Sequence, residues 1–339
     1  MRKIFALLIL ISLMPALVCC KEKDAPKVAV LWRDISESSA LCEKFDKKMR
    51  FSGISYMHYD ADGRETVLIS QAKEAIKNGA PALIVNCEFV TTVFAVSSLA
   101  KEAGIPVIFM TSDTFTETLS FYSGAYSVAT DAALLYESFG KAIADDVIKR
   151  YSEYDKNGDG KISYVAFGLS AEAVITVNTV LKQKGFPELL TVVHDPLADE
   201  AENIASIFGD YTGNGDIPAE LIITQNDECI KDIIPILREH GLNNKSSKSN
   251  SVPIYTVGAS DEKIIPQDKL AEDSTLYSVR DLINEGSITF AIIPDEAAMA
   301  KSTVKLLCNI MYGKNAFKGI NNKMISSDQT VTIKYDIYD

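Results

Sequence analysis

Short apolar runs alternate with segments of helical periodicity along the first part of the chain. Four runs have the length and composition of buried strands in a parallel sheet: 27–32, 54–59, 82–86 and 106–110. Between the second and third runs, Leu68, Ala72 and Ile76 recur at the spacing of one helix face. Gly79 follows them and can adopt the left-handed conformation that ends a helix. This strict alternation of strands and helices predicts a doubly wound α/β unit.

A second alternation follows a long amphipathic helix, predicted to begin at Asp131, in which Leu135, Phe139 and Ile143 share one face. Five further segments have the character of strands: 162–167, 189–194, 220–224, 253–257 and 288–293. The tail, 330–338, alternates apolar and polar residues as a closing strand would. We therefore predict an α/β fold of two doubly wound, Rossmann-like lobes joined by a multi-strand hinge.

The two predicted lobes are discontinuous in the sequence, because the final segments cross back between them. We expect one lobe to comprise residues 27–130 plus 295–328, and the other to comprise 131–294 plus 329–339. In open α/β sheets, ligands bind outside the carboxyl ends of the strands. The sequence therefore predicts a solute-binding cleft between the lobes.

Composition and motifs exclude several classes of function. The chain of 339 residues is 47% hydrophobic, which allows a large core, and its net charge of −12 argues against nucleic acid as a partner. After the leader, no basic run is long enough to hold an anionic polymer or a membrane surface. The HExxH, GxSxG, P-loop and GxGxxG patterns are missing from the sequence. We therefore expect a protein that is not an enzyme.

Residues 1–20 form a predicted secretion signal, with a basic start, an apolar run to Val18 and a cysteine pair, Cys19 and Cys20. The apolar run is too short to be a membrane-spanning helix. The LVCC sequence before the charged KEKDAPK segment resembles a bacterial lipoprotein signal, which is cleaved before a lipidated cysteine. We favour lipidation at Cys20 over Cys19; an ordinary signal peptide is the alternative.

The segment after the cysteines, 21–26, is a predicted tether whose extended length is roughly 20 Å. Two or more acyl chains hold a protein stably at a membrane, whereas one chain does not. We therefore expect the mature chain in the periplasm or cell envelope, anchored to the membrane by its N-terminal lipid.

The run DKNGDGKIS, 155–163, has the pattern of a calcium loop. Oxygen ligands are predicted at its alternate positions: Asp155, Asn157, Asp159 and, through its carbonyl, Lys161. Gly160 permits the sharp turn that such a loop needs. Position twelve, where an EF-hand has a bidentate glutamate, is Ala166, so a further carboxylate must come from elsewhere in the chain. The alternative is a solvated turn that binds no ion.

The order of elements, the loop after the long helix and the ELIITQND segment at 220–227 together resemble type I periplasmic binding proteins, and most closely the glucose/galactose-binding family. The resemblance covers essentially the whole mature chain. It implies that Glu220 completes a Ca²⁺ site with the loop. It also implies that Ser163 stands at the ninth position, where a water could bridge to the ion.

The same resemblance implies a solute site that has diverged. Glu37 and Asn226 stand where the family has polar contacts to sugar, and Thr111 replaces an amide. Other positions depart from the sugar-binding residues of the family: Ser39, Val174, Ala198, Gly258 and Pro294. Because each unpartnered sugar hydroxyl costs about 1–3 kcal/mol, glucose and galactose are expected to bind negligibly. Trp32 and Phe167 are candidate contacts for a less polar solute, although Trp32 could equally be a core residue that closes a strand.

The function implied is that of a substrate-binding lipoprotein that serves an ABC-type importer, binds a small solute of the sugar class and carries a structural calcium ion. Its expected partner is an ABC transporter permease or a membrane sensor, and it is expected to be a monomer. The alternatives are a binding protein for a less polar, non-hexose solute, and a sensor or interaction module that acts without a ligand.

Overall fold

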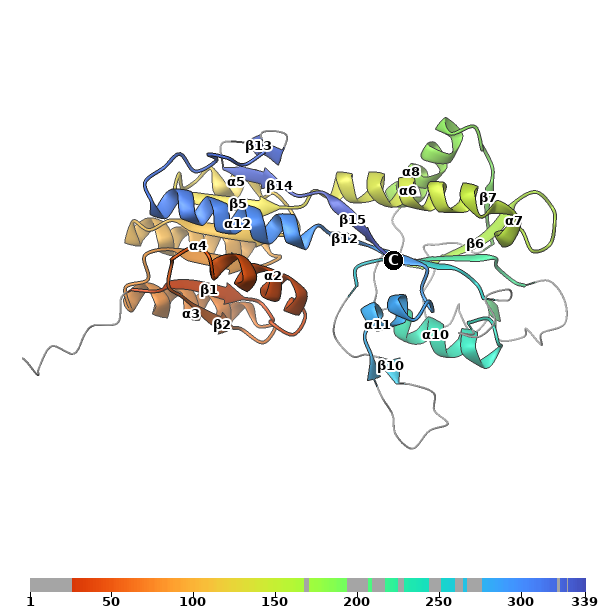
Figure 1. The fold of residues 1–339 in the computed structure, drawn as a ribbon, viewed down its shortest axis with the longest axis horizontal. Coiled ribbons are helices and arrows are strands. Elements are labelled where there is room, and N and C mark those ends of the chain that lie inside the picture. Colours follow the sequence, from red (N-terminus) through yellow and green to blue (C-terminus); the bar gives the residue numbers. More distant parts are fainter. Residues whose placement is uncertain are drawn as a thin grey trace, which may run out of the picture.

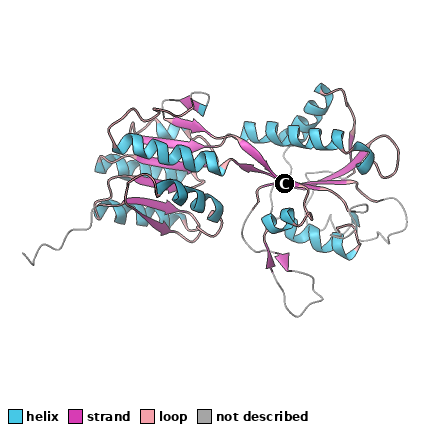
Figure 2. Ribbon diagram, in the orientation of Figure 1, coloured by secondary structure: helices cyan, strands magenta, loops and turns pink. Residues whose placement is uncertain are grey.

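The computed structural model describes residues 26–167, 171–193, 207–208, 217–224, 229–243, 251–259, 265–266, 276–321, 324–327 and 329–339. These residues form two α/β lobes that lie one after the other along the long axis of the molecule (Figure 1). Each lobe has a mainly parallel sheet with helices on both faces (Figure 2). The predicted fold class is therefore confirmed.

The first lobe contains a seven-stranded sheet in the order β13-β14-β5-β4-β3-β1-β2. Its strands are β1 (Val28–Trp32), β2 (Tyr56–Asp60), β3 (Leu83–Asn86), β4 (Val107–Thr111), β5 (Ala125–Ala129), β13 (Ile325–Ser327) and β14 (Thr330–Thr332). All neighbouring pairs are parallel except β13 with β14. Its helices are α2 (Ser39–Met49), α3 (Glu65–Lys77), α4 (Val90–Ala103), α5 (Thr116–Leu119) and α12 (Glu296–Met311).

Successive residues of the central strands point to opposite faces of this sheet, so each strand is buried on both sides. Val30 of β1 packs with Phe45 of α2 and Leu307 of α12 on one face. Leu31, the next residue, packs with Leu68 of α3 on the other face, which α4 also covers. This burial on both faces explains why the strands are continuous apolar runs in the sequence.

The second lobe contains a six-stranded sheet in the order β15-β12-β9-β8-β6-β7. Its strands are β6 (Ile162–Phe167), β7 (Leu190–Val192), β8 (Leu221–Thr224), β9 (Ile254–Val257), β12 (Phe290–Pro294) and β15 (Tyr335–Tyr338). Its helices are α6 (Ala132–Lys149), α7 (Tyr151–Tyr154), α8 (Ala171–Gln183), α10 (Ile230–Glu239) and α11 (Val279–Asn284). Two short strands outside the sheet, β10 (Ile265–Pro266) and β11 (Leu276–Tyr277), pair with each other. Ile222 packs towards α10 and α11, whereas Ile223 packs towards α6 and α8.

The chain passes between the two sheets three times: from β5 to α6, from β12 to α12, and from β14 to β15. The crossings are bonded to one another, because the Ile333 amide donates to the Ala129 carbonyl at 2.7 Å and the Asp295 amide donates to the Lys334 carbonyl at 2.9 Å. All three crossings meet the first sheet at the carboxyl ends of its strands.

The last crossing lies later in the chain than expected. We predicted the whole tail from 329 in the second lobe, but β14 pairs in parallel with β5 of the first sheet, and only β15 joins β12 of the second. The alternation of apolar and polar residues continues through both strands, so the sequence carries no signal for the change of sheet.

Candidate functional site

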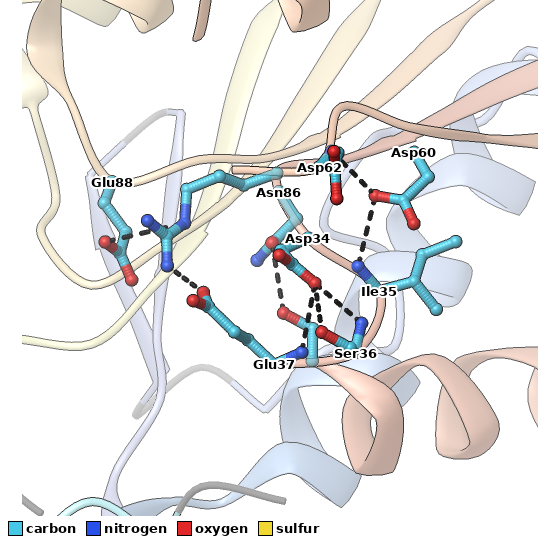
Figure 3. A network of polar contacts seen from close by, with 10 residues as sticks. Asp34, Ile35, Ser36, Glu37, Asp60, Asp62, Asn86 and Glu88 are labelled. Carbon is cyan, nitrogen blue, oxygen red and sulfur yellow. Dashed lines mark hydrogen bonds and ion pairs between the residues drawn. The ribbon is translucent and has the colours of Figure 1, made fainter. Parts of the chain in front are cut away.

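Polar side chains gather where β1, β2 and β3 end (Figure 3). In the first sheet β1 lies between β2 and β3, so the strand order reverses direction at β1. The loops that follow neighbouring strands diverge at such a point, and this is where open α/β sheets bind ligands. Asp60 ends β2, Asn86 ends β3, and the loop 33–38 follows β1.

Arg33 links two of these loops. Its guanidinium pairs with Glu37, four residues later, and its Nε lies 3.8 Å from Oε2 of Glu88, which follows β3. The side chains of Arg33, Glu37 and Glu88 are 24%, 37% and 51% exposed. The three groups therefore present charge-assisted hydrogen-bonding atoms that remain accessible from solvent.

Hydrogen bonds within the loop hold this group in place. The carboxylate of Asp34 accepts from the Ser36 amide at 2.8 Å and from the Ser36 hydroxyl at 2.6 Å, and the hydroxyl bond is the main reason that the pKa of Asp34 is lowered. Oδ1 of Asp60 accepts from the Ile35 amide at 3.3 Å. Ser38 donates to the side-chain oxygen of Asn86 at 3.4 Å, which joins the loop to β3.

The predicted contacts of the first lobe differ in their accessibility. Glu37 belongs to the polar group just described, whereas Thr111, at the end of β4, is only 4% exposed. The Thr111 hydroxyl donates to the Asp113 carbonyl at 2.6 Å and lies 3.2 Å from the Ser127 hydroxyl. Thr111 therefore shapes the strand end and has little free hydrogen-bonding capacity for a solute.

Trp32 is a core residue. Its side chain is fully buried, at 0% exposure, and its indole N–H donates to Nδ1 of His58 at 2.8 Å. Because Nδ1 accepts this bond, Nε2 of His58 carries the proton, which points to Oδ1 of Asp46 at 2.9 Å. Phe167, at the end of β6, is 2% exposed and packs in the core of the second lobe. Neither aromatic side chain offers a surface to a solute.

At the carboxyl ends of the second sheet, most of the residues that the structure describes are uncharged. Thr224 ends β8 and donates to the Thr256 hydroxyl at 2.7 Å. Gly258 follows β9 with φ of 86°, a conformation that favours glycine, and Pro294 ends β12. Asn226 and Ala198 lie outside the described residues. Asp295 directly follows β12, but its carboxylate caps α12 by accepting the Ala298 amide at 2.8 Å. The charged group of Arg33, Glu37 and Glu88 therefore comes from the first lobe alone.

The structure brings Glu220 to the predicted calcium loop. Glu220 directly precedes β8, is 2% exposed, and accepts the Lys156 amide at 2.6 Å and the Asn157 amide at 3.2 Å through Oε1. Its Oε2 accepts from the Ser163 amide at 2.8 Å and from the Ser163 hydroxyl at 2.9 Å. Glu220 thus fixes both ends of the loop to the second sheet.

The loop has the internal bonding expected from its alternate polar positions. Asp155 accepts the Gly158 amide at 2.7 Å, and Asn157 accepts the Asp159 amide at 2.8 Å. Asp159 accepts the Lys161 amide at 2.8 Å. The hydroxyl of Tyr151 also donates to Asp155 at 2.8 Å, and this bond is the main reason that the pKa of Asp155 is lowered.

The oxygen ligands of this set suit Ca²⁺, but the arrangement is only partly that of an ion site. All the carboxylate oxygens of Glu220 already accept hydrogen bonds from the loop. A bidentate contact to an ion would have to replace some of these bonds. The residue types therefore fit calcium, whereas the conformation of Glu220 fits a loop held by hydrogen bonds.

Within the part of the chain that the structure describes, one group of acidic, histidine or cysteine side chains lies close enough to share an ion: Cys42, Asp46 and His58. Its chemistry does not favour a metal. Neither ring nitrogen of His58 is open to an ion: Nδ1 accepts the hydrogen bond from Trp32, and Nε2, which faces Asp46, carries the proton. Burial, with Asp46 and Asp60 nearby, raises the pKa of the Cys42 thiol to about 11, so the thiolate is disfavoured as well.

Comparisons with known proteins agree with this architecture. The periplasmic binding protein domain matches residues 35–315 of the chain, which include strands and helices of both lobes. A periplasmic sugar-binding protein from Pseudomonas fluorescens has a TM-score of 0.57 and 13% identity, with 91% of this chain and 86% of that chain covered. An ABC sugar transporter subunit from Rhodobacter sphaeroides 2.4.1 has a TM-score of 0.55 and 14% identity, with 92% and 97% covered.

A third similar structure, the Caulobacter myo-inositol binding protein bound to myo-inositol, has a TM-score of 0.52 and 16% identity, and the match covers 92% of each chain. At this level of identity, the solved structures show a common fold. The domain match supplies the family, because it spans most of the chain and reaches into both lobes. The chain belongs to the periplasmic binding protein family, whose members bind solutes and are not enzymes.

Proposed function

We propose that this protein is the solute-binding component of an ABC-type importer and that it captures a small, hydroxyl-rich solute between its lobes. The observation that carries the proposal is the accessible group of Arg33, Glu37 and Glu88 at the strand-order reversal of the first sheet. This group lies at the same end of the sheet as the three crossings. A solute held there would also be within reach of the second lobe.

The chemistry of the group favours hydroxyl groups over an apolar solute. A guanidinium donates several hydrogen bonds in one plane, and a carboxylate can accept from two neighbouring hydroxyls. A less polar solute would need apolar contacts, and both Trp32 and Phe167 are buried. Sugars and myo-inositol, which the names of similar structures mention, are examples of the class that this chain would take.

Glucose and galactose remain poor candidates within that class. Val174, Gly258 and Pro294 supply no charged or amide group to a hexose from the second lobe. Each lost charged or bidentate partner would reduce affinity by about 1–3 kcal/mol, and 1.4 kcal/mol is a tenfold change. Isothermal titration on solute-free protein should therefore detect no binding of either sugar in the micromolar range. A micromolar dissociation constant for either sugar would contradict this assignment.

Mass spectrometry of small molecules released on denaturation would identify the solute, and titration would then measure its affinity. Glu37→Gln should weaken binding by about tenfold or more, because it removes a charged acceptor and the partner of Arg33. Glu43→Gln is the matched control, since Glu43 is a 68% exposed residue on α2 that pairs with Lys47 away from the site. Equal effects of the two substitutions, or no released solute, would argue against the proposal. The second outcome would favour a ligand-independent interaction module.

We further propose that the protein acts at the cell envelope, anchored by a lipid on Cys20, or alternatively on Cys19, and works as a monomer with an ABC permease or a membrane sensor. The signal, both cysteines and the tether up to residue 25 lie outside the described residues. The LVCC sequence before a charged segment supports the anchor. Among the residues that the structure describes, no helix has the length and apolar character needed to span a membrane.

We also propose that the loop 155–163 and Glu220 bind a structural Ca²⁺ ion. The alternate oxygen ligands and the contact of Glu220 with the loop support this proposal. The ion would supply positive charge among three carboxylates, those of Asp155, Asp159 and Glu220. Its role would be to tie the loop after α7 to the start of β8, and it would take no part in solute recognition.

A further inference from the structure

One end of the first lobe exposes large aromatic and basic side chains together. Phe51, just after α2, is 90% exposed, the highest exposure of any large apolar side chain that the structure describes. Tyr312, just after α12, is 55% exposed. The two segments touch, because the Tyr312 hydroxyl donates to the carbonyl of Ser52 at 2.9 Å.

Basic residues surround these rings. Lys48 and Arg50 lie beside Phe51 and are exposed, and the Nζ of Lys314 lies 5.4 Å from the centroid of the Tyr312 ring. The nearest acidic residues on α2 are engaged elsewhere: Glu43 pairs with Lys47 at 2.7 Å, and Asp46 accepts hydrogen bonds from Tyr56 and His58. A chain with a net charge of −12 thus has a locally basic surface at this end. We call Lys48, Arg50, Phe51, Tyr312 and Lys314 the basal patch.

The chain enters the first lobe beside the basal patch. The amide of Val28, the first residue of β1, donates to the carbonyl of Ser55 at 2.9 Å, four residues after Phe51. The predicted tether, 21–26, has six residues and an extended length of roughly 20 Å, and only Lys27 separates it from β1. A lipid on Cys20 would therefore hold this end of the lobe within reach of the membrane surface.

The composition of the basal patch fits that surface. Lys and Arg are attracted to anionic headgroups over about one Debye length, roughly 8–10 Å, and aromatic rings settle at the headgroup level. Acyl chains hold a protein at a membrane, and an amphipathic surface adds a contact that fixes which face of the protein meets it. The three crossings and the Arg33 group lie at the opposite end of the first sheet, so docking by the basal patch would turn the solute site away from the membrane.

We propose that the basal patch docks on the anionic phospholipid headgroups of the membrane that holds the lipid anchor, and so orients the first lobe. The proposal rests on the lipid-anchored placement proposed above, but its test does not require the lipid. The chain from Cys20 to Asp339, with Cys20→Ser to keep it unacylated, would be mixed with vesicles of phosphatidylcholine or of phosphatidylcholine with phosphatidylglycerol. Cosedimentation would measure the bound fraction.

Binding should be at least tenfold tighter to the anionic vesicles, and it should weaken as salt shortens the Debye length. Lys48→Glu with Lys314→Glu should reduce it at least tenfold, and Phe51→Ser should reduce it severalfold. Lys182→Glu with Lys231→Glu, two exposed positions of the second lobe, makes the same change in net charge and should leave binding nearly unchanged.

Equal binding to both kinds of vesicle, or equal losses from the two double variants, would overturn the proposal. A dimer in sedimentation that Lys48→Glu with Lys314→Glu abolishes, without any vesicle binding, would overturn it as well and assign the basal patch to a second copy. Solute affinity should be the same in all these variants. Solute binding without vesicle binding would therefore reject membrane docking by the basal patch and leave the proposed transport function intact.

Discussion

The side chain of Trp32 could belong to the core or bind a solute, and the partner of its indole N–H distinguishes the two roles. Its indole N–H donates a hydrogen bond to Nδ1 of His58, and no part of the ring is exposed. Trp32→Phe should lower the free energy of unfolding by roughly 1–3 kcal/mol, because Nδ1 of His58 loses its donor and the smaller ring packs less well. Urea denaturation followed by circular dichroism would measure the change. Unchanged stability with a loss of solute affinity would instead make Trp32 a binding residue.

Glu220 combines a buried charge with four hydrogen bonds from the loop. Glu220→Gln replaces one acceptor oxygen by a donor that faces other donors, so we expect a loss of about 1–3 kcal/mol in unfolding free energy. It should also weaken calcium binding more than Ser163→Ala, which removes only a hydroxyl. Thermal melts and calcium titrations of both variants would test this order, and a larger effect of Ser163→Ala would contradict it.

At the scale of elements, calcium should act as a staple on the loop 155–163. Because binding stabilises only the folded chain, chelation should lower the melting temperature without unfolding the protein. The hydrogen bonds from Glu220 would keep the loop in place after the ion is removed. Melting curves with and without chelator would measure the effect. Identical curves, with removal of the metal verified by elemental analysis, would count against an ion at this loop.

The same loop should contribute to acid sensitivity. The pKa of Asp155 is lowered in the folded chain, first by the hydrogen bond from Tyr151. Its stabilising contribution is therefore complete above the unfolded pKa of about 3.9, and it is lost as pH falls through the lower folded pKa. Asp155→Asn should flatten the fall in unfolding free energy below about pH 4. Asp62→Asn, at a side chain that is 82% exposed, is the control and should keep the slope of the parent. If the unfolding free energy of Asp155→Asn fell with pH as steeply as that of the parent, Asp155 would not be a source of the acid sensitivity.

The elements themselves were largely predictable, since burial on both faces makes a strand a continuous apolar run. The run at 106–110 corresponds to β4, Val107–Thr111, and the run at 162–167 has the bounds of β6. The step from β14 to β15 was not predictable, because both strands show the same alternation and only the pairing of β14 with β5 separates them.

The candidate site was predictable only in part. Glu37 was proposed through the resemblance to sugar-binding proteins, which places a polar contact in the loop after the first strand, whereas Arg33 and Glu88 were not proposed. The sequence did carry a signal for them: Arg33 directly follows the apolar run 27–32, and Glu88 lies two residues after the run 82–86. Only the adjacency of β1 and β3 in the sheet shows that the two residues meet.

At the scale of the whole molecule, the predicted anchor determines where the protein works. Protein made in its native envelope should carry a diacylglycerol on Cys20, or on Cys19, and should partition into detergent, because acyl chains confer affinity for a membrane. Intact-mass spectrometry of the detergent phase would identify the modified residue. Recovery of the whole population as an unmodified, water-soluble form would rule out the anchor. The basal patch could not be foreseen in the same way, because its residues come from two segments, 48–51 and 312–314, that only folding brings together.

The position of α12 and β14 in the first lobe has a consequence for how the protein is made. While the chain grows on the ribosome, β5 is paired only with β4 and lacks β14, and one face of the first sheet is covered by α2 but lacks α12, until residues 296–332 have been synthesised. Contacts between such distant segments form slowly, and early intermediates expose apolar surface. The nascent first lobe therefore stays incomplete until almost the entire chain exists. If residues 1–20 act as the predicted secretion signal, this delay is an advantage, because a polypeptide that has not yet folded can still be threaded across a membrane.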